Sequence, residues 1–162
     1  TSTAIVGIGV AAAAGVGAFV VAGSHGTSRA AGATVSSGSV RTASATVGGK
    51  NETILTDARG MPLYYYAPDR PDRSLVSGAL AGLWPPVISA AAPASTGLTG
   101  TLSVVHDSHG SQVAYNGHLL YTFVRDRQDV VTGQGVQNFF VATPTLSSSS
   151  HTSAGTTMYG GY

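Results

Sequence analysis

The sequence predicts a mainly β fold: a small domain of two tandem β repeats, preceded by one N-terminal transmembrane α-helix and a flexible tether. Three observations support this. A ten-residue pattern occurs twice in the middle of the chain, residues 4–22 are apolar and uncharged, and residues 51–144 show no 3.6-residue apolar period. The first indicates a duplication, the second a membrane-spanning helix and the third strands rather than helices.

The repeated pattern is Gly-x-x-Leu-Tyr-x-aromatic-x-x-Asp. Its first copy consists of Gly60, Leu63, Tyr64, Tyr66 and Asp69, and its second copy consists of Gly117, Leu120, Tyr121, Phe123 and Asp126. Every matched position is offset by the same distance, since 117 − 60 and 126 − 69 both give 57. A constant offset indicates a duplicated structural unit. We expect repeats at about 52–100 and 101–144, packed together around one core.

Short β-prone runs bounded by turn residues set the expected strands. They lie at 54–56, 63–66, 84–88, 102–106, 112–115, 119–124 and 138–143. Asn116-Gly117 is the strongest hairpin signal, because both residues tolerate the positive φ of a two-residue turn. Trp84 is expected in the core, and Tyr65 should point away from the face that Tyr64 and Tyr66 share.

The N-terminal segment 1–23 is expected to be a retained membrane helix. Its nineteen apolar residues, 4–22, would span about 28 Å as a helix, close to the ~30 Å core of a bilayer. A helix buried in a filament core is the alternative. Small residues recur every four positions on two faces, which lets another helix approach closely. These helix-packing candidates are Gly7, Ala11, Gly15, Gly9, Ala13 and Gly17.

Two segments rich in small polar residues flank the folded middle. Residues 24–50 are rich in Gly, Ser, Ala and Thr without an apolar period, which is typical of a linker. Residues 145–162 form a Ser/Gly-rich tail that we expect to be disordered unless a partner surface holds it.

Composition excludes several classes of function. The 162-residue chain has a net charge of +1, so it lacks the basic surface of a nucleic-acid-binding protein. It contains no Cys, which excludes disulfides, thiolate zinc sites and iron–sulfur clusters. Only 9% of its residues are charged. No Ser-His-Asp set, phosphate-binding loop or paired catalytic Glu is recognisable, and no cofactor is expected.

The motif residues resemble a bacterial secreted-repeat family of predicted lipoproteins with a Tyr-x-(Phe/Trp/Tyr)-x-x-Asp motif. The matching runs are Tyr64–Asp69, Tyr121–Asp126, Trp84-Pro85-Pro86, 112–117 and 133–136, and the resemblance covers about 52–144. It implies an extracytoplasmic, often membrane-attached domain whose biochemical role is largely unassigned. The cations that follow the apolar segment would argue for the opposite orientation, so the expected sidedness rests on the resemblance.

Two departures from the family pattern involve cysteine. Family members often carry a Cys pair before the Trp-Pro-Pro run, where this chain has Val76 and Leu80. Apolar packing would have to replace that link. Many relatives also carry a Cys for lipid attachment, so the segment 4–22 would be the anchor here.

The motif carboxylates Asp69 and Asp126 have two interpretations. They could bind a cation or act as acid and base. Alternatively, each could cap the loop that follows it by accepting backbone N–H groups. Repetition at a fixed offset favours the capping role.

Histidines and tyrosines are weaker candidates. His106, His109 and His118 could hold zinc or copper, although 106 and 109 straddle an expected turn. Tyrosines on alternate strand positions could line a ligand groove or an electron path, but some are more typical of core and partner surface. These are Tyr64, Tyr65, Tyr66, Tyr115 and Tyr121.

Together these features predict a non-catalytic accessory subunit. One helix would dock on a larger membrane complex, such as a respiratory or photosynthetic electron-transport assembly, with the β domain on the extracytoplasmic side of the cell membrane. An extracytoplasmic ligand- or metal-binding domain and a structural subunit of a surface filament are the alternatives.

Overall fold

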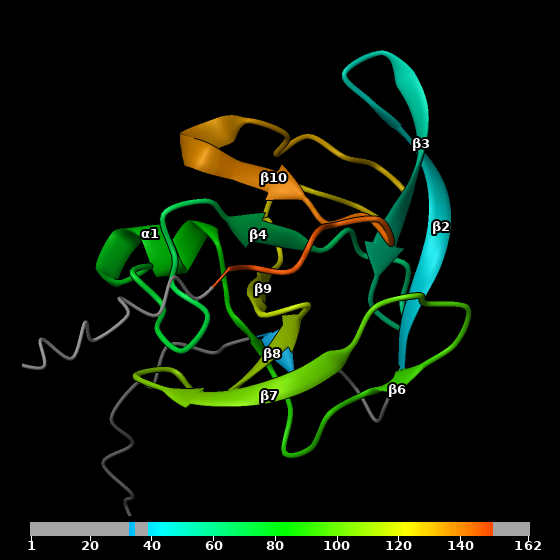
Figure 1. Ribbon diagram of the computed structural model, residues 1–162. Coiled ribbons are helices and arrows are strands. Elements are labelled where there is room, and N and C mark those ends of the chain that lie inside the picture. The colour runs from blue at the N-terminus through cyan, green and yellow to red at the C-terminus, as the bar shows by residue number, and fades with distance from the viewer. Residues whose placement is uncertain (1–32, 35–38, 151–162) are drawn as a thin grey trace, which may run out of the picture.

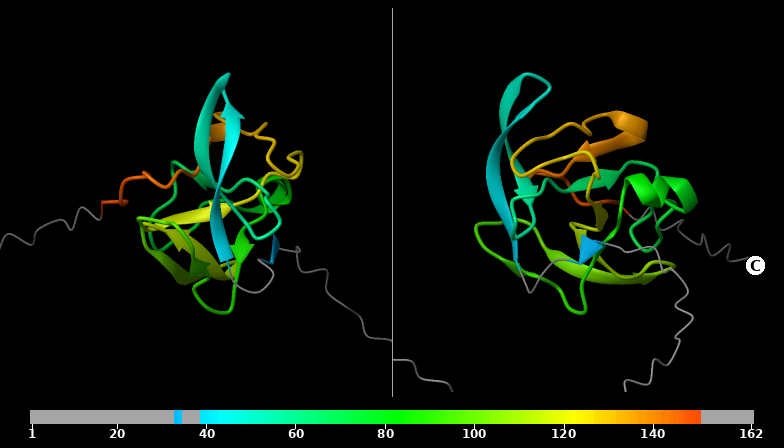
Figure 2. Two further views of the ribbon diagram at one scale, coloured as in Figure 1. Left: turned by 90° about the vertical axis from the view of Figure 1, so that its right-hand side faces the viewer. Right: turned by 180° about the vertical axis from the view of Figure 1, so that it is seen from behind.

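The computed structural model describes residues 33–34 and 39–150, which form a mainly β domain with two sheets (Figures 1 and 2). The larger, seven-stranded sheet has the order β1-β5-β8-β9-β4-β10, with β7 also paired to β8, and the smaller has the order β3-β2-β6. The elements are β1 Ala33–Thr34, β2 Ser39–Val47, β3 Lys50–Thr56, β4 Tyr64–Tyr66, α1 Gly78–Leu83, β5 Val87–Ile88, β6 Ala94–Ser95, β7 Leu102–Asp107, β8 Gly110–Tyr115, β9 His118–Tyr121, η1 Val136–Asn138 and β10 Phe139–Val141.

The two repeats are interleaved in the larger sheet. β4 of the first copy pairs antiparallel with β9 of the second, and Tyr64 lies opposite Tyr121. β10 of the second copy then pairs with β4 of the first, while β5 of the first pairs with β8 of the second. Strand pairing therefore joins the segments that carry the two motif copies into one domain.

Strand alternation divides the core into two clusters. Tyr64, Trp84, Tyr121 and Phe139 belong to one cluster, and all four are fully buried. The other cluster is centred on Leu55, Leu63, Val87, Val113, Tyr115 and Leu120. Trp84 is a core residue, as the sequence predicted. Tyr65 packs at the margin of the second cluster, opposite to the face of Tyr64 and Tyr66, because neighbouring strand residues point to opposite sides.

Part of the expected linker forms strands. Ala33–Thr34 form β1, which pairs with β5, and residues 39–47 form β2, which pairs with β3 through a turn at Gly48-Gly49. The expectation of a linker over all of 24–50 is therefore wrong for these strands. Both glycines have positive φ, 55° and 83°, as a two-residue hairpin turn requires. Val40, Ala45 and Val47 are buried, which gives this Ser/Thr-rich strand its apolar face.

Two short helical elements were not expected. α1 has six residues, too few to show a helical period in the sequence, and it follows Ser77, whose side chain makes no capping hydrogen bond. η1 follows Gly135 at the matching position of the second repeat. Gly78 and Gly135 keep the offset of 57 and both have positive φ.

The start of the C-terminal tail is held by the chain itself. The backbone N–H of Ser149 donates to the carbonyl of Asn116 at 3.0 Å, and the Asn116 side chain donates to the carbonyl of Leu146 at 2.7 Å. Residues 145–150 thus lie against the β8–β9 turn. For this part of the tail, the expectation of disorder without a partner surface is wrong.

The expected membrane helix at 1–23 lies outside the described residues. Within residues 33–34 and 39–150, no helix is long and apolar enough to cross a membrane.

Candidate functional site

The motif residues of the two repeats bind each other reciprocally. The hydroxyl of Tyr64, on β4, donates a hydrogen bond to Oδ2 of Asp126 in the second repeat. The hydroxyl of Tyr121, on β9, donates to Oδ2 of Asp69 in the first repeat at 2.5 Å. Each repeat therefore supplies the tyrosine for the other repeat's carboxylate.

The second oxygen of each carboxylate caps the following loop. Oδ1 of Asp69 accepts the backbone N–H of Leu75 at 2.7 Å, and Oδ1 of Asp126 accepts the backbone N–H of Thr132 at 2.8 Å. Leu75 and Thr132 are again 57 residues apart. This is the backbone contact expected from the turn chemistry, whereas the tyrosine contact was not anticipated.

Burial keeps the hydroxyls of Tyr64 and Tyr121 protonated. Removal from water raises the pKa of both tyrosine hydroxyls, and the neighbouring carboxylates raise it further. Burial also raises the pKa of Asp69, an effect partly opposed by the hydrogen bonds from Leu75 and Tyr121. The tyrosines thus remain donors at neutral pH, and they are not suited to act as general bases there.

Stacked aromatic rings belong to the same core cluster as Tyr64 and Tyr121. Trp84 lies between Phe123 and Phe139, with ring centroids 4.2 and 3.9 Å away, and Tyr66 stacks on Phe139 at 4.6 Å. Gly133 permits this packing, since a Cβ there would lie 2.5 Å from a ring carbon of Trp84. The site is therefore a packed aromatic core rather than a groove open to a ligand.

The three candidate histidines each have a separate local contact. Nε2 of His109 lies 2.7 Å from the carbonyl of Val76, Nδ1 of His106 lies 3.1 Å from the Ser111 hydroxyl, and Nε2 of His118 lies 3.0 Å from the carbonyl of Ser147. Among residues 33–34 and 39–150, no group of three or more His, Cys, Asp or Glu side chains is arranged to hold a metal ion.

Val76 and Leu80, at which family members often carry a Cys pair, belong to or pack against the core cluster that contains Trp84. Val76 is buried within that cluster, and Leu80, from α1, packs at its edge. Apolar contacts of Val76 and Leu80 therefore stand where family members often have the Cys pair. The helix-packing candidates between Gly7 and Gly17 lie outside the described residues.

Two buried polar atoms near the Tyr121–Asp69 pair have no hydrogen-bond partner among the described residues. They are Oδ2 of Asp107 and Oε1 of Gln112. Gln112 is fully buried and donates through Nε2 to the carbonyl of Leu120 at 2.9 Å. The sequence did not predict the burial of Gln112. Its only sign was the position of this residue directly before the apolar residues of β8, and a single Gln in a strand indicates no particular contact.

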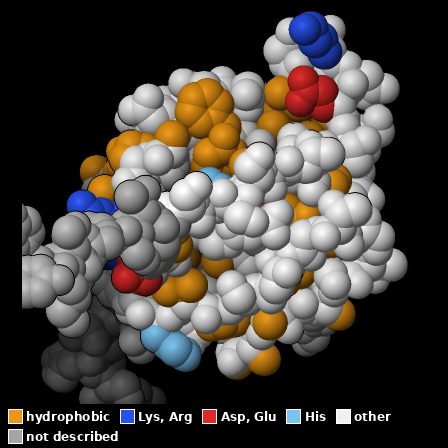
Figure 3. All heavy atoms as spheres, viewed as in Figure 1, with side chains coloured by type: hydrophobic (Ala, Val, Ile, Leu, Met, Phe, Trp, Pro, Cys, Tyr) orange, Lys and Arg blue, Asp and Glu red, His pale blue; other side chains and the backbone are white. Residues whose placement is uncertain are grey.

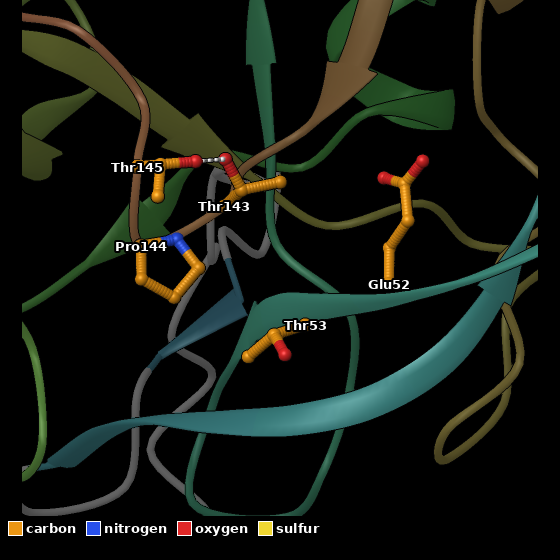
Figure 4. Close-up of a pocket in the computed structure, with 5 residues that line it drawn as sticks. All are labelled: Glu52, Thr53, Thr143, Pro144 and Thr145. Carbon is orange, nitrogen blue, oxygen red and sulfur yellow. Dashed lines mark hydrogen bonds between the residues drawn. The ribbon is translucent and has the colours of Figure 1, made fainter.

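Surface hollows in the described part of the chain are open and formed by few residues. One, of about 510 Å³, is lined by Glu52, Thr53, Thr143, Pro144 and Thr145. Figure 4 shows Glu52 and Thr53 on β3, across from the segment of the other three residues. It lies apart from the Tyr–Asp pairs, none of whose residues lines it.

Comparison with known proteins concerns the first repeat. Residues 45–88 match the family model described as a secreted repeat of unknown function. This segment is therefore similar to that repeat. It contains the first motif copy, in agreement with the resemblance seen in the sequence, while the second copy lies beyond the match. The family indicates an extracytoplasmic location. No curated protein and no solved structure matches the chain.

Proposed function

We propose that this protein is a non-catalytic accessory subunit outside the cytoplasm, docked on a larger membrane complex through residues 4–22. The observation that carries the proposal is the reciprocal bonding of the repeated motif. Both tyrosine hydroxyls and all four carboxylate oxygens of Tyr64, Tyr121, Asp69 and Asp126 are engaged within the domain. The most distinctive chemistry of the chain thus holds the two repeats together.

A scaffold of this kind suits a protein that presents surfaces. Its motif hydroxyls and carboxylates are bonded within the domain, so binding falls to the exposed strands, loops and the apolar segment. The four-residue spacing of small residues in 4–22 supports close packing against another helix. An electron-transport complex of the respiratory or photosynthetic type is the partner class to test first.

Native mass measurement of the full chain tests the proposal. The chain is extracted from its own membrane in a mild detergent and weighed together with whatever remains bound. We expect a complex containing at least one different protein. A purely monomeric chain contradicts the proposal, and a ladder of multiples of its own mass supports the filament alternative instead.

Matched substitutions locate the contact on the helix. Replacing Gly7, Ala11 and Gly15 together by Leu fills one small-residue face, and we expect this variant to lose the partner. The control variant replaces Val6, Val10 and Val16 by Leu, which keeps the segment apolar and leaves the small residues intact. Equal partner retention by both variants would contradict docking through this face.

A further inference from the structure

The outer edge of β3 carries unpaired backbone groups. β3 is the end strand of the smaller sheet, and its inner edge pairs with β2 in a register that joins Val47 to Lys50 and Ala45 to Glu52. In a hairpin with a two-residue turn, each of these two opposed pairs is a hydrogen-bonded pair. The residue between them on β3, Asn51, therefore directs its backbone N–H and C=O groups away from β2.

Only the first half of this edge is uncovered. Leu55 directs its N–H to the carbonyl of Ala142 at 2.7 Å, and its carbonyl accepts the N–H of Leu63 at 2.9 Å. Asn51 and Thr53, which also turn outward, have no backbone partner within the described residues. Their side chains are exposed. Open strand edges are the usual templates for pairing with another chain.

The uncovered half lies on a projecting hairpin. β2 and β3 extend beyond the rest of the domain, and Figure 3 shows basic and acidic side chains side by side at its outer end. At this end of the hairpin β3 begins with Lys50 and Glu52 follows two residues later, and they are the single Lys and the single Glu of the whole chain. Lys50 and Glu52 precede and follow Asn51, and their side chains share the face opposite to that of Asn51. This end of the strand therefore carries one charge of each sign.

We propose that two copies of this chain pair antiparallel along β3, centred on Asn51 of each copy. In this register the two Asn51 residues exchange N–H···O=C bonds across a two-fold axis. Lys50 of each copy then lies opposite Glu52 of the other, giving two ion pairs at directly opposed positions. Residues from Leu55 onward extend past the partner's turn, so the contacts of Leu55 with Ala142 and Leu63 are retained.

The opposite charges of Lys50 and Glu52 favour the β3 edge over the β2 edge, and they favour a second copy of this chain as the strand that pairs with it. The opposite edge of the hairpin, formed by β2, has Ala45, Thr46 and Val47 at the equivalent level and no charged side chain. A register centred on Glu52 would instead oppose two carboxylates. An open hollow lies beside Glu52 and Thr53, between this edge and residues 143–145 (Figure 4). Because so few residues pair, the contact is weak in solution.

Cysteine cross-linking of the full chain tests the register, since the natural sequence contains no Cys. Opposed residues in a hydrogen-bonded antiparallel pair have Cα atoms about 5.5 Å apart, within the range that a disulfide bridges. We therefore expect Asn51→Cys to form a disulfide-linked homodimer under mild oxidation. Thr53→Cys would place its Cα atoms about 13 Å apart at ~3.3 Å per residue and should not cross-link. Thr46→Cys, on the opposite edge, is the second control.

Charge exchange tests the ion pairs. In the Asn51→Cys chain, Lys50→Glu or Glu52→Lys alone opposes like charges, and we expect roughly fivefold to tenfold less dimer. The double exchange Lys50→Glu with Glu52→Lys restores complementarity and should restore the dimer. All these side chains are exposed, so folding should be retained, and Trp84 fluorescence checks this.

Three results would overturn the pairing of two copies. They are equal cross-linking of Asn51→Cys and Thr46→Cys, no recovery in the double exchange, or capture by Asn51→Cys of a protein of different mass only. This inference is independent of docking through residues 4–22, because the homodimer contains one kind of chain whereas the accessory role requires a second kind.

Discussion

Tyr64 and Tyr121 lie directly opposite each other in the β4–β9 pair, and they are separated by the same 57 residues that separate the two motif copies. An approximate two-fold relation between the repeats therefore passes through this residue pair. Around it, each tyrosine reaches the carboxylate of the other repeat. Neither tyrosine bonds the carboxylate of its own repeat, so each Tyr–Asp bond requires both motif copies.

Glycine at position 133 is required by the aromatic stack. We expect Gly133→Ala to lower the free energy of unfolding by about 1–3 kcal/mol, because the added Cβ would overlap Trp84 in a filled core. Gly82→Ala, in exposed α1 with open space around it, is the control and should raise stability by about 0.5–1 kcal/mol. Urea unfolding followed by Trp84 fluorescence measures both. Equal effects of the same sign would contradict this packing.

The buried environment of Asp69 predicts a specific pH dependence. Burial raises the pKa of this carboxyl above its value in the unfolded chain, so the folded state binds the proton more tightly. The resulting stabilisation is fully present below the unfolded pKa of about 3.9 and is lost as the pH rises through the folded pKa. The wild-type protein should therefore lose stability relative to Asp69→Asn as the pH rises from about 4.

Unfolding titrations at a series of pH values measure this difference. Asp72→Asn removes an exposed carboxylate from the same loop and serves as the control. The prediction is contradicted if the stability of the wild type relative to Asp69→Asn stays constant, or increases, as the pH rises. Burial would then not govern the pKa of this carboxyl.

Zinc should leave the thermal unfolding midpoint unchanged. The ring nitrogens of His106, His109 and His118 each contact a different local group, so they do not converge on one ion. Differential scanning calorimetry with and without excess zinc checks this, and a chelator-treated sample gives the baseline. A midpoint raised by several degrees would contradict the expectation and indicate that zinc binds the folded chain.

Local signals in the sequence were sufficient for several elements. Asn116-Gly117 predicted the β8–β9 hairpin, and both residues have positive φ in the structure. The size and apolar character of Trp84 predicted its burial. The two Asp residues were expected to accept backbone N–H groups, and they do. Each of these features depends on neighbours close in the chain or on side-chain chemistry alone.

Features that depend on distant contacts could not be predicted in this way. β2 reads as a linker because its many Ser, Thr and Ala residues carry little apolar signal, although Gly48-Gly49 marked its turn. The partner of Tyr64 is 62 residues away, and nothing local selects Asp126 over Asp69. That choice follows from the exchange of strands between repeats, which only the assembled sheet determines.

A double-mutant cycle between Tyr64 and Asp126 tests most directly the claim that the motif bonds the two repeats together. Urea unfolding is measured for the wild type, Tyr64→Phe, Asp126→Ala and the double variant, with Tyr65→Phe in place of Tyr64→Phe as the control, because Tyr65 lies on the other face of β4. The account predicts a coupling free energy of about 1.5–3 kcal/mol for Tyr64 with Asp126, and less than about 0.5 kcal/mol for the control. A Tyr64–Asp126 coupling no larger than the control's would contradict it.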